Sequence, residues 1–107
     1  MVVEVRHADI WWVGPDPFDQ RRPVLVVTRQ SILPFLTSIV VAPITRRIRG
    51  IITEIALGPS DGLGERCVAS FDNLQTVHVG RFERRVGSLG LVREAEICSA
   101  LEALAGC

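Results

Sequence analysis

The chain has 107 residues, which suits a single domain spanning residues 1–107 and leaves little room for a second. Hydrophobic residues make up 48% of it, which indicates a folded core and argues against disorder or a disulfide-stapled miniature. The formal net charge is zero, no apolar run approaches the length of a membrane span, and the N-terminal residues lack the pattern of a signal peptide. We therefore expect a cytoplasmic protein with no membrane partner.

Short apolar segments separated by turn residues predict strands along most of the chain. The first four strands are expected at residues 9–13, 23–28, 37–44 and 51–57, with a helical turn at residues 31–35. The second of these strands is apolar on both faces, which indicates a central position in the sheet. Pro43 predicts that the third strand ends at an edge or a bulge.

The second half of the chain predicts further strands and one helix. Residues 67–71 and 74–77 are expected to form one bent strand or two short ones. From Leu91 the apolar period becomes helical, which predicts a closing amphipathic helix of about 13 residues. The helical stripe consists of Ile97, Ala100, Leu101 and Leu104. Five or six strands and this helix predict an all-β fold with a C-terminal helix, a small SH3-like barrel.

The charge is distributed unevenly along the chain. Residues 20–53 contain no acidic residue and six arginines, namely Arg21, Arg22, Arg29, Arg46, Arg47 and Arg49. Such a block can form a patch that attracts phosphate on an otherwise neutral protein. The alternative is that charges cluster by chance in a short chain. All basic residues are arginines, but a GC-rich genome would give the same bias, so this observation decides nothing.

No metal or cofactor site is recognisable in the sequence. Cys67, Cys98 and Cys107 are widely spaced, which is typical of unpaired thiols packed as small hydrophobic residues. The chain has no phosphate-binding glycine loop, no zinc motif and no close pair of carboxylates. We therefore expect no cofactor.

Without a metal site, a protein of this kind that cuts RNA must use the 2′-hydroxyl of the RNA as the nucleophile. The protein then orients the RNA backbone and neutralises the charge that grows on the scissile phosphate.

Two segments combine arginines with the end of a strand. In the first, Arg21 and Arg22 precede Pro23, which restricts Arg22 to an extended backbone. In the second, Thr45 ends a strand, and it is followed by Arg46, Arg47 and Arg49. Each segment is a candidate phosphate site. The alternatives are that Arg22 is a solvated charge at a strand start and that Thr45 is an ordinary β-branched strand residue.

Five blocks of the sequence occur in order over nearly the whole chain. They are Ile10-Trp11-Trp12-Val13, Arg21-Arg22-Pro23-Val24-Leu25-Val26-Val27, Ala42-Pro43-Ile44-Thr45, Asp72-Asn73-Leu74-Gln75-Thr76-Val77 and Arg85-Val86-Gly87-Ser88-Leu89. Together with the closing helix, this pattern is similar to that of the MazF/PemK toxins. The resemblance implies a CcdB/PemK-like barrel, a homodimer, and the toxin of a type II toxin–antitoxin pair. It further implies metal-independent cleavage of single-stranded RNA at short sequences, leaving a 2′,3′-cyclic phosphate and a 5′-hydroxyl.

The resemblance also assigns residues and a protein partner. The family's essential arginine falls on Arg22, which we expect to bind the phosphate and stabilise the transition state, because a guanidinium is a poor proton donor. Proton donation by Arg22 is the alternative. The family's essential threonine falls on Thr45, expected to hydrogen-bond the phosphate or orient the 2′-hydroxyl. The residues expected to bind RNA are Gln20, Arg21, Arg46, Arg47, Asn73 and Gln75. The expected antitoxin carries an acidic, partly disordered segment that covers the arginine block.

Two departures from the family pattern concern the choice of RNA sequence. The first loop is shorter than in the family pattern, because residues 17–20 are followed directly by Arg21 and Arg22. Gln75 stands where the family has an arginine, while Asn73 keeps an amide that can hydrogen-bond a base. We therefore expect these departures to change RNA recognition more than catalysis.

Four aromatic and histidine residues leave alternatives open. Adjacent strand residues point to opposite faces, so we expect one of Trp11 and Trp12 in the core and the other at the surface or a dimer interface. Stacking of the exposed ring on an RNA base is a further interpretation. His78 is either an exposed loop residue or a participant in proton transfer. His7 is expected to be structural or to face solvent.

Two rival functions are compatible with the same barrel. Related toxins poison DNA gyrase, and a non-catalytic RNA-binding module would bind RNA and leave it intact. A gyrase poison needs no phosphate-facing pair of Arg22 and Thr45. The presence of that pair favours an endoribonuclease.

Overall fold

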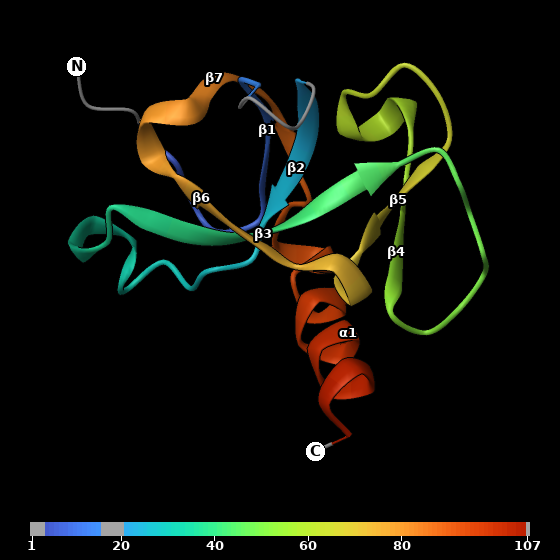
Figure 1. Cartoon of the computed structure of the whole chain (residues 1–107). Coiled ribbons are helices and arrows are strands. Elements are labelled where there is room, and N and C mark those ends of the chain that lie inside the picture. The colour runs from blue at the N-terminus through green and yellow to red at the C-terminus, as the bar shows by residue number, and fades with distance from the viewer. Residues whose placement is uncertain (1–3, 16–20, 107) are drawn as a thin grey trace.

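Strand β3 (Ser38–Thr45) is the longest strand, and the sheet is built around it (Figure 1). The computed structural model describes residues 4–15 and 21–106, and this part of the chain forms seven strands and one α-helix. The other elements are β1 (Asp9–Val13), β2 (Arg22–Val26), β4 (Glu54–Leu57), β5 (Cys67–Ser70), β6 (Gln75–His78), β7 (Phe82–Ser88) and α1 (Ala95–Ala105). The sheet has the order β4-β5-β3-β2-β1-β7, with β6 also beside β3. The predicted class, all-β with a C-terminal helix, is confirmed.

One edge of β3 changes its neighbour along the strand. It pairs with β6 as far as Val41 and with β5 from Ile44 onward, while β2 runs along the opposite edge through Pro43. The sheet therefore opens between β6 and β5. A proline has no N–H to give to a ladder, and it is accommodated at this transition. The strand predicted at residues 37–44 is observed at Ser38–Thr45, and its last two residues, Ile44 and Thr45, pair with β5.

Two apolar cores lie on opposite faces of β2. Leu25 belongs to one core, and its neighbours Val24 and Val26 belong to the other. This alternation explains why the strand is apolar at successive positions, as expected for a central strand. Helix α1 covers the first core through Ile97 and Ala100, which are both buried. In Figure 1 the helix projects from one side of the curled sheet.

Several predicted elements are confirmed, with shifted boundaries. The first strand coincides with the predicted residues 9–13, and the helical turn is a 3-10 turn at Leu33–Phe35. The segment from residue 67 to residue 78 forms two strands, separated by a 3-10 turn at Phe71–Asn73. The fourth strand begins at Glu54, because the chain turns there and the Glu54 N–H donates to the Ile51 carbonyl. The helix begins at Ala95, after a 3-10 turn at Leu91–Arg93.

Strand β7 is missing from the sequence-based prediction of five or six strands. It lies at the edge of the sheet and pairs with β1. Its successive residues Glu83, Arg84 and Arg85 are exposed and charged. Charged side chains on an edge strand discourage pairing with another chain, but they also remove the apolar alternation by which a strand is recognised. At Gly87, strand β7 passes close to the backbone of Asp61. A Cβ at this position would lie only 2.5 Å from the carbonyl oxygen of Asp61, so glycine is needed here.

The two adjacent tryptophans have different environments, as predicted. Trp11 is buried, its ring packs edge-on against Phe82 at 5.9 Å between centroids, and its Nε1–H donates to Asp9 at 3.1 Å. Trp12 is half-buried. In the described part of the chain, no helix has the length and apolar character needed to cross a membrane.

The cysteines only partly follow the prediction. Cys67 and Cys98 are both free thiols. Cys67 is buried, and this burial is the main reason that its pKa is raised. Cys98 is exposed, so the prediction that it packs as a small hydrophobic residue is wrong. Cys107 lies outside the described residues.

Candidate active site and RNA interface

An open cleft of about 430 Å³ lies at the place where β3 changes its neighbour. Its walls come from the start of β2, the end of β3, the loop that follows β3, the end of β5, the turn after β5, and the start of β6. The lining residues are Arg22, Pro43, Thr45, Arg47, Arg49, Ser70, Asn73 and Gln75. All of them are polar or charged except Pro43. The opening of the sheet thus gathers polar groups from segments that are distant in sequence.

Strand pairing brings Arg22 and Thr45 to the same end of the sheet. The ladder between β2 and β3 ends with Val24 opposite Pro43, and Arg22 and Thr45 each lie two residues further along their strands. Side chains two residues apart on a strand project from the same side of the sheet. Arg22 is also fixed in β2 through its pairing with Val13 of β1. Both side chains are half-buried and line the cleft.

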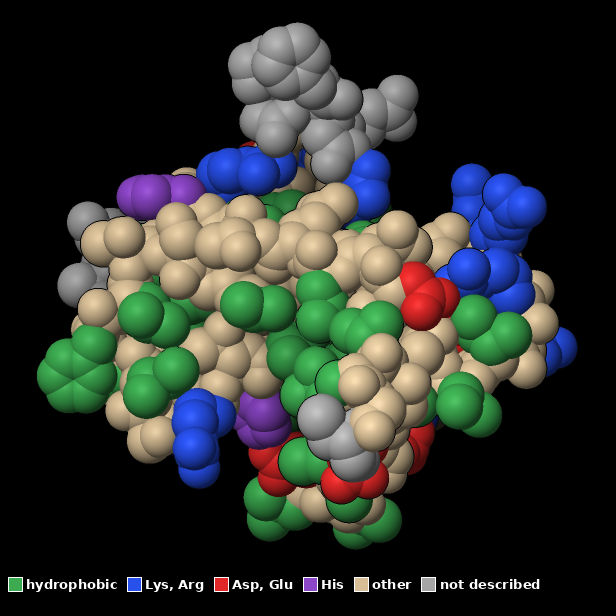
Figure 2. All heavy atoms as spheres, turned by 60° about the horizontal axis from the view of Figure 1, so that its bottom comes forward, with side chains coloured by type: hydrophobic (Ala, Val, Ile, Leu, Met, Phe, Trp, Pro, Cys, Tyr) green, Lys and Arg blue, Asp and Glu red, His purple; other side chains and the backbone are tan. Residues whose placement is uncertain are grey.

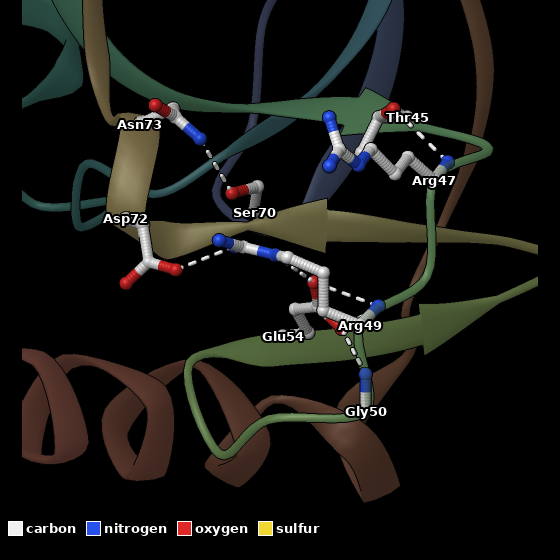
Figure 3. A network of polar contacts seen from close by, with 8 residues as sticks. All are labelled: Thr45, Arg47, Arg49, Gly50, Glu54, Ser70, Asp72 and Asn73. Atoms are coloured by element: carbon white, nitrogen blue, oxygen red, sulfur yellow. Dashed lines mark hydrogen bonds and ion pairs between the residues drawn. The ribbon is translucent and has the colours of Figure 1, made fainter.

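The Thr45 hydroxyl is oriented by the chain that follows it (Figure 3). Its Oγ1 accepts the backbone N–H of Arg47 at 3.2 Å, which is a local turn at the end of β3. A hydroxyl that accepts one hydrogen bond still has its own proton to donate. Thr45 can therefore donate to an oxygen atom of a bound phosphate group.

Arg49 is tied to two carboxylates at the other side of the cleft (Figure 3). Its Nε donates to Glu54 at 3.0 Å, and its Nη2 donates to Asp72 at 2.5 Å. The Glu54 side chain is only 3% exposed and also accepts the backbone N–H groups of Arg49 and Gly50, at 3.1 and 2.9 Å. Gly50 has a left-handed backbone, with φ of 72°, which favours glycine at this turn. Glu54 therefore holds the loop after β3 in place.

The contacts of Glu54 shift its pKa. Burial alone would raise the pKa of this carboxyl group, but hydrogen bonds from the Arg49 side chain and from backbone N–H groups outweigh burial and lower it. The same carboxylates raise the pKa of Arg49, with the hydrogen bond to Glu54 as the largest cause. The pair is thus ionised throughout the neutral range.

The amides of Asn73 and Gln75 form the wall of the cleft next to β6. Asn73 Nδ2 donates to Ser70 Oγ at 2.9 Å, so its carbonyl oxygen is turned away from Ser70 (Figure 3). Gln75 is half-buried and is fixed in the ladder opposite Val41. An amide with one group anchored and the other directed outward is suited to hydrogen bonding with the edge of a base.

The structure separates the predicted site residues into two groups. Arg22, Thr45, Arg47, Asn73 and Gln75 are brought together in the cleft. Arg21 and Arg46 do not line it, and they form ion pairs with Glu83 at 2.7 Å and with Glu65 at 2.9 Å. Gln20 lies outside the described residues.

Two polar residues that line the cleft, Arg49 and Ser70, were not among the predicted catalytic or RNA-binding residues. Arg49 belongs to the arginine run after Thr45, so the sequence contains a signal for it, but nothing in the sequence distinguishes it from its neighbours. Ser70 ends an apolar strand and carries no signal of its own. Both are recognised only from the pairing of β5 with β3 and β4.

The arginine block does not form a single bare patch. Arg21, Arg46 and Arg49 are paired with carboxylates from elsewhere in the chain, and Arg29 lies beyond the opposite end of β2. Within residues 4–15 and 21–106, Arg47 has no ion-pair partner. Three arginines of the block, Arg22, Arg47 and Arg49, line the cleft, and Arg49 is paired there with Glu54 and Asp72.

The two histidines lie away from this cleft. His78 is at the far end of β6 from Gln75, and its Nδ1 accepts the backbone N–H of Gly80 at 2.9 Å. His7 has its Nδ1 3.0 Å from the Thr28 carbonyl oxygen and its Nε2 3.8 Å from Glu94. Neither ring lines the cleft.

Residues 6–105 match the family model of the PemK-like, MazF-like toxins of type II toxin–antitoxin systems. A relative named endoribonuclease MazF3, from Mycobacterium tuberculosis, is 40% identical over 83 residues, which cover 78% of this chain and 81% of the relative. The solved structure of M. tuberculosis toxin MazF-mt6 is 35% identical and superposes with a TM-score of 0.81, over 90% of this chain and 94% of that one. An endoribonuclease solved with its cognate antitoxin, from a mycobacterial species, has a TM-score of 0.82 at 23% identity, covering 96% of each chain.

We predict that Glu54→Gln weakens the acid dependence of stability. Because the pKa of Glu54 is lowered in the folded state, its contribution is fully present above the unfolded pKa, about 4.3, and is lost as the pH falls through the folded pKa. The free energy of unfolding of the wild type should therefore decrease more steeply below this pH than that of the variant. Urea denaturation at a series of pH values measures this difference. Glu102→Gln, at an exposed position of α1, is the matched control, and curves that stay parallel for wild type and Glu54→Gln would contradict the role of Glu54.

Proposed function

This chain belongs to the PemK-like, MazF-like toxin family and is an endoribonuclease of a toxin–antitoxin system, and we propose that the cleft at the end of β3 is its RNA-cleaving site. The observation that carries the proposal is that Arg22 of β2 and Thr45 of β3 line one cleft, which also contains Arg47. A cation, a hydroxyl donor and a second cation in one polar cleft suit a phosphodiester backbone.

The proposed reaction is a metal-independent transesterification of single-stranded RNA. The 2′-oxygen forms a bond to the adjacent phosphorus and gives up its proton. The bond from phosphorus to the 5′-oxygen breaks, and that oxygen takes up a proton. The products are a 2′,3′-cyclic phosphate and a 5′-hydroxyl.

Arg22 and Thr45 would act on the charge that develops at phosphorus. In the pentacoordinate transition state, negative charge grows on the non-bridging oxygens, and a prepositioned cation stabilises it. Arg22 has this role, and we assign it no proton transfer because a guanidinium is a poor proton donor. Thr45 donates its hydroxyl proton to a non-bridging oxygen, since its oxygen already accepts from Arg47.

Arg47, Asn73 and Gln75 would bind the strand on either side of the scissile bond. Arg47 provides a phosphate contact, which positions the RNA without reading its sequence. The amides of Asn73 and Gln75 provide base contacts, because unstacked bases of a single strand expose their hydrogen-bonding edges. Gln75, in place of the arginine of the family pattern, favours a recognition sequence different from that of family members that keep the arginine.

We also propose a symmetric homodimer and inhibition by an antitoxin. Phe35, Ile52, Leu91 and Val92 are each at least 80% exposed, and Figure 2 shows hydrophobic side chains at several places on the side that is at the bottom of Figure 1. Exposed apolar side chains of this kind can be covered in an interface between copies of the chain, and closed symmetry is the usual outcome. The arginines of the cleft would attract an acidic segment of the antitoxin as well as RNA.

We predict that Arg22→Ala and Thr45→Ala each lose most of the cleavage rate on single-stranded RNA in EDTA. Removing one contact to a charged transition state costs roughly a hundredfold in rate. Arg47→Ala should mainly weaken binding, and Asn73→Ala should change which sequences are cut.

Primer extension on a long RNA maps the cuts, and analysis of the ends should show the cyclic phosphate and the 5′-hydroxyl. Arg29→Ala, beyond the far end of β2, is the matched control and should cut normally. Full activity of Arg22→Ala would refute the proposed mechanism.

The proposed assembly predicts twice the chain mass of 11.8 kDa by light scattering at micromolar concentration. The affinity for the cognate antitoxin should fall as the salt concentration rises, because the contacts are between opposite charges. Calorimetry at several salt concentrations measures this. A monomeric mass would count against the dimer. An affinity for the antitoxin that does not change with salt concentration would count against binding through an acidic segment.

A further inference from the structure

Arg49 has two carboxylate partners in the cleft, one buried and one partly exposed. Its Nε contacts Glu54, whose side chain is 3% exposed, and its Nη2 contacts Asp72, whose side chain is 30% exposed. The Arg49 side chain is itself 42% exposed and lines the cleft with Arg22 and Thr45. The guanidinium is thus anchored on one side and faces the cleft with the other.

The two contacts of Arg49 have unequal strength. Glu54 also accepts two backbone N–H groups, and removing one partner of a buried charge leaves the other uncompensated, so this contact is retained. The contact with Asp72 joins two partly exposed side chains, and such surface ion pairs contribute about 0–1 kcal/mol. Asp72 can therefore be replaced by another anion at little cost. A phosphodiester is suited to the exchange, because a guanidinium pairs with it through two parallel hydrogen bonds.

We propose that Arg49 is a phosphate-binding subsite of the RNA cleft, and that Asp72 is a built-in carboxylate which occupies it until a backbone phosphate of the RNA displaces it. The proposal deepens the proposed function and rests on it. Arg22 and Thr45 hold the scissile phosphate, whereas Arg49, on the far side of the cleft, holds another phosphate of the same strand. Asp72 thereby sets how tightly RNA binds, and Glu54 keeps the guanidinium oriented in both states.

This arrangement makes opposite predictions for the two members of the ion pair. Arg49→Gln removes one phosphate contact, so the slope of the logarithm of affinity against the logarithm of salt concentration should decrease by about 0.7 for a single strand. Asp72→Asn removes the competing carboxylate and keeps the anchor at Glu54. Its affinity should therefore rise, by up to about fivefold, which is the factor equivalent to a surface ion pair. In the double variant Arg49→Gln/Asp72→Asn, the gain from Asp72→Asn should disappear.

The experiment measures binding of a 2′-O-methyl copy of an RNA that the wild-type protein cuts. Methylation blocks attack by the 2′-oxygen, so binding is measured without cleavage. Titrations at several salt concentrations compare the wild type, both single variants, the double variant and the control Glu65→Gln. Glu65 is matched to Asp72 because it is also paired with an exposed arginine, Arg46, but away from the cleft. Thermal unfolding of each variant checks that it is folded. If Arg49→Gln disturbs the loop after β3, Asp72→Asn still tests the proposal, because it leaves the contact between Arg49 and Glu54 in place.

The outcomes separate the subsite from the proposed function. If the wild type cuts RNA, but Arg49→Gln keeps the wild-type salt slope or Asp72→Asn fails to bind more tightly, the subsite is refuted and the proposed function stands. An equal gain in Glu65→Gln, or a gain that persists in the double variant, also refutes it, because the effect would then be one of overall charge. A wild-type protein that does not cut single-stranded RNA refutes the proposed function itself.

Discussion

Strand β3 changes its neighbour from β6 to β5 between Val41 and Ile44, and the cleft depends on this constraint. A sheet that kept one ladder along β3 would pair the backbone where the cleft now opens. The opposite edge of β3 is paired with β2 from Val41 to Pro43, so the same strand that opens the cleft also brings the start of β2, with Arg22, to its wall. Pro43 lies at this transition, where a missing N–H is tolerated.

Carboxylates from outside the arginine block determine where its charge acts. Glu83 and Glu65 pair with Arg21 and Arg46 on the surface, away from the cleft. Surface ion pairs of this kind add little to stability. Their carboxylates nevertheless offset the positive charge of the two arginines. The cleft keeps Arg22, Arg47 and Arg49 on its walls. A chain of zero net charge thus places three arginines on the walls of one cleft.

The sequence predicted those parts of the fold that depend on local patterns. Residues 9–13 and the closing helix follow from apolar periodicity, and Arg22 and Thr45 follow from strand-end motifs whose resemblance to a family is specific. Strand β7 was missed because the exposed charges of Glu83, Arg84 and Arg85 suit an edge and conceal the strand period. An edge position is a property of the whole sheet, and periodicity within one segment does not contain it.

The sequence predicted some residues of the candidate site but not all of them. Arg46, Arg47 and Arg49 are equivalent in the sequence, but in the structure Arg47 and Arg49 line the cleft and Arg46 does not. Ser70 and Asp72 enter the site through the pairing of β5 with β4, which brings residue 70 opposite Glu54. Long-range pairing of this kind has no local sequence signal, so the resemblance to a family could supply Arg22 and Thr45 and still miss Arg49.

The central claim is that the RNA supplies its own nucleophile in the cleft between Arg22 and Thr45. Its most direct test uses an RNA substrate with a single 2′-deoxynucleotide on the 5′ side of a mapped cleavage site, with cutting followed at that site and at an unmodified site of the same molecule. The account predicts that the modified site stays intact while the other is cut at the normal rate, because only the attacking oxygen is missing. Cleavage at the deoxynucleotide would contradict it.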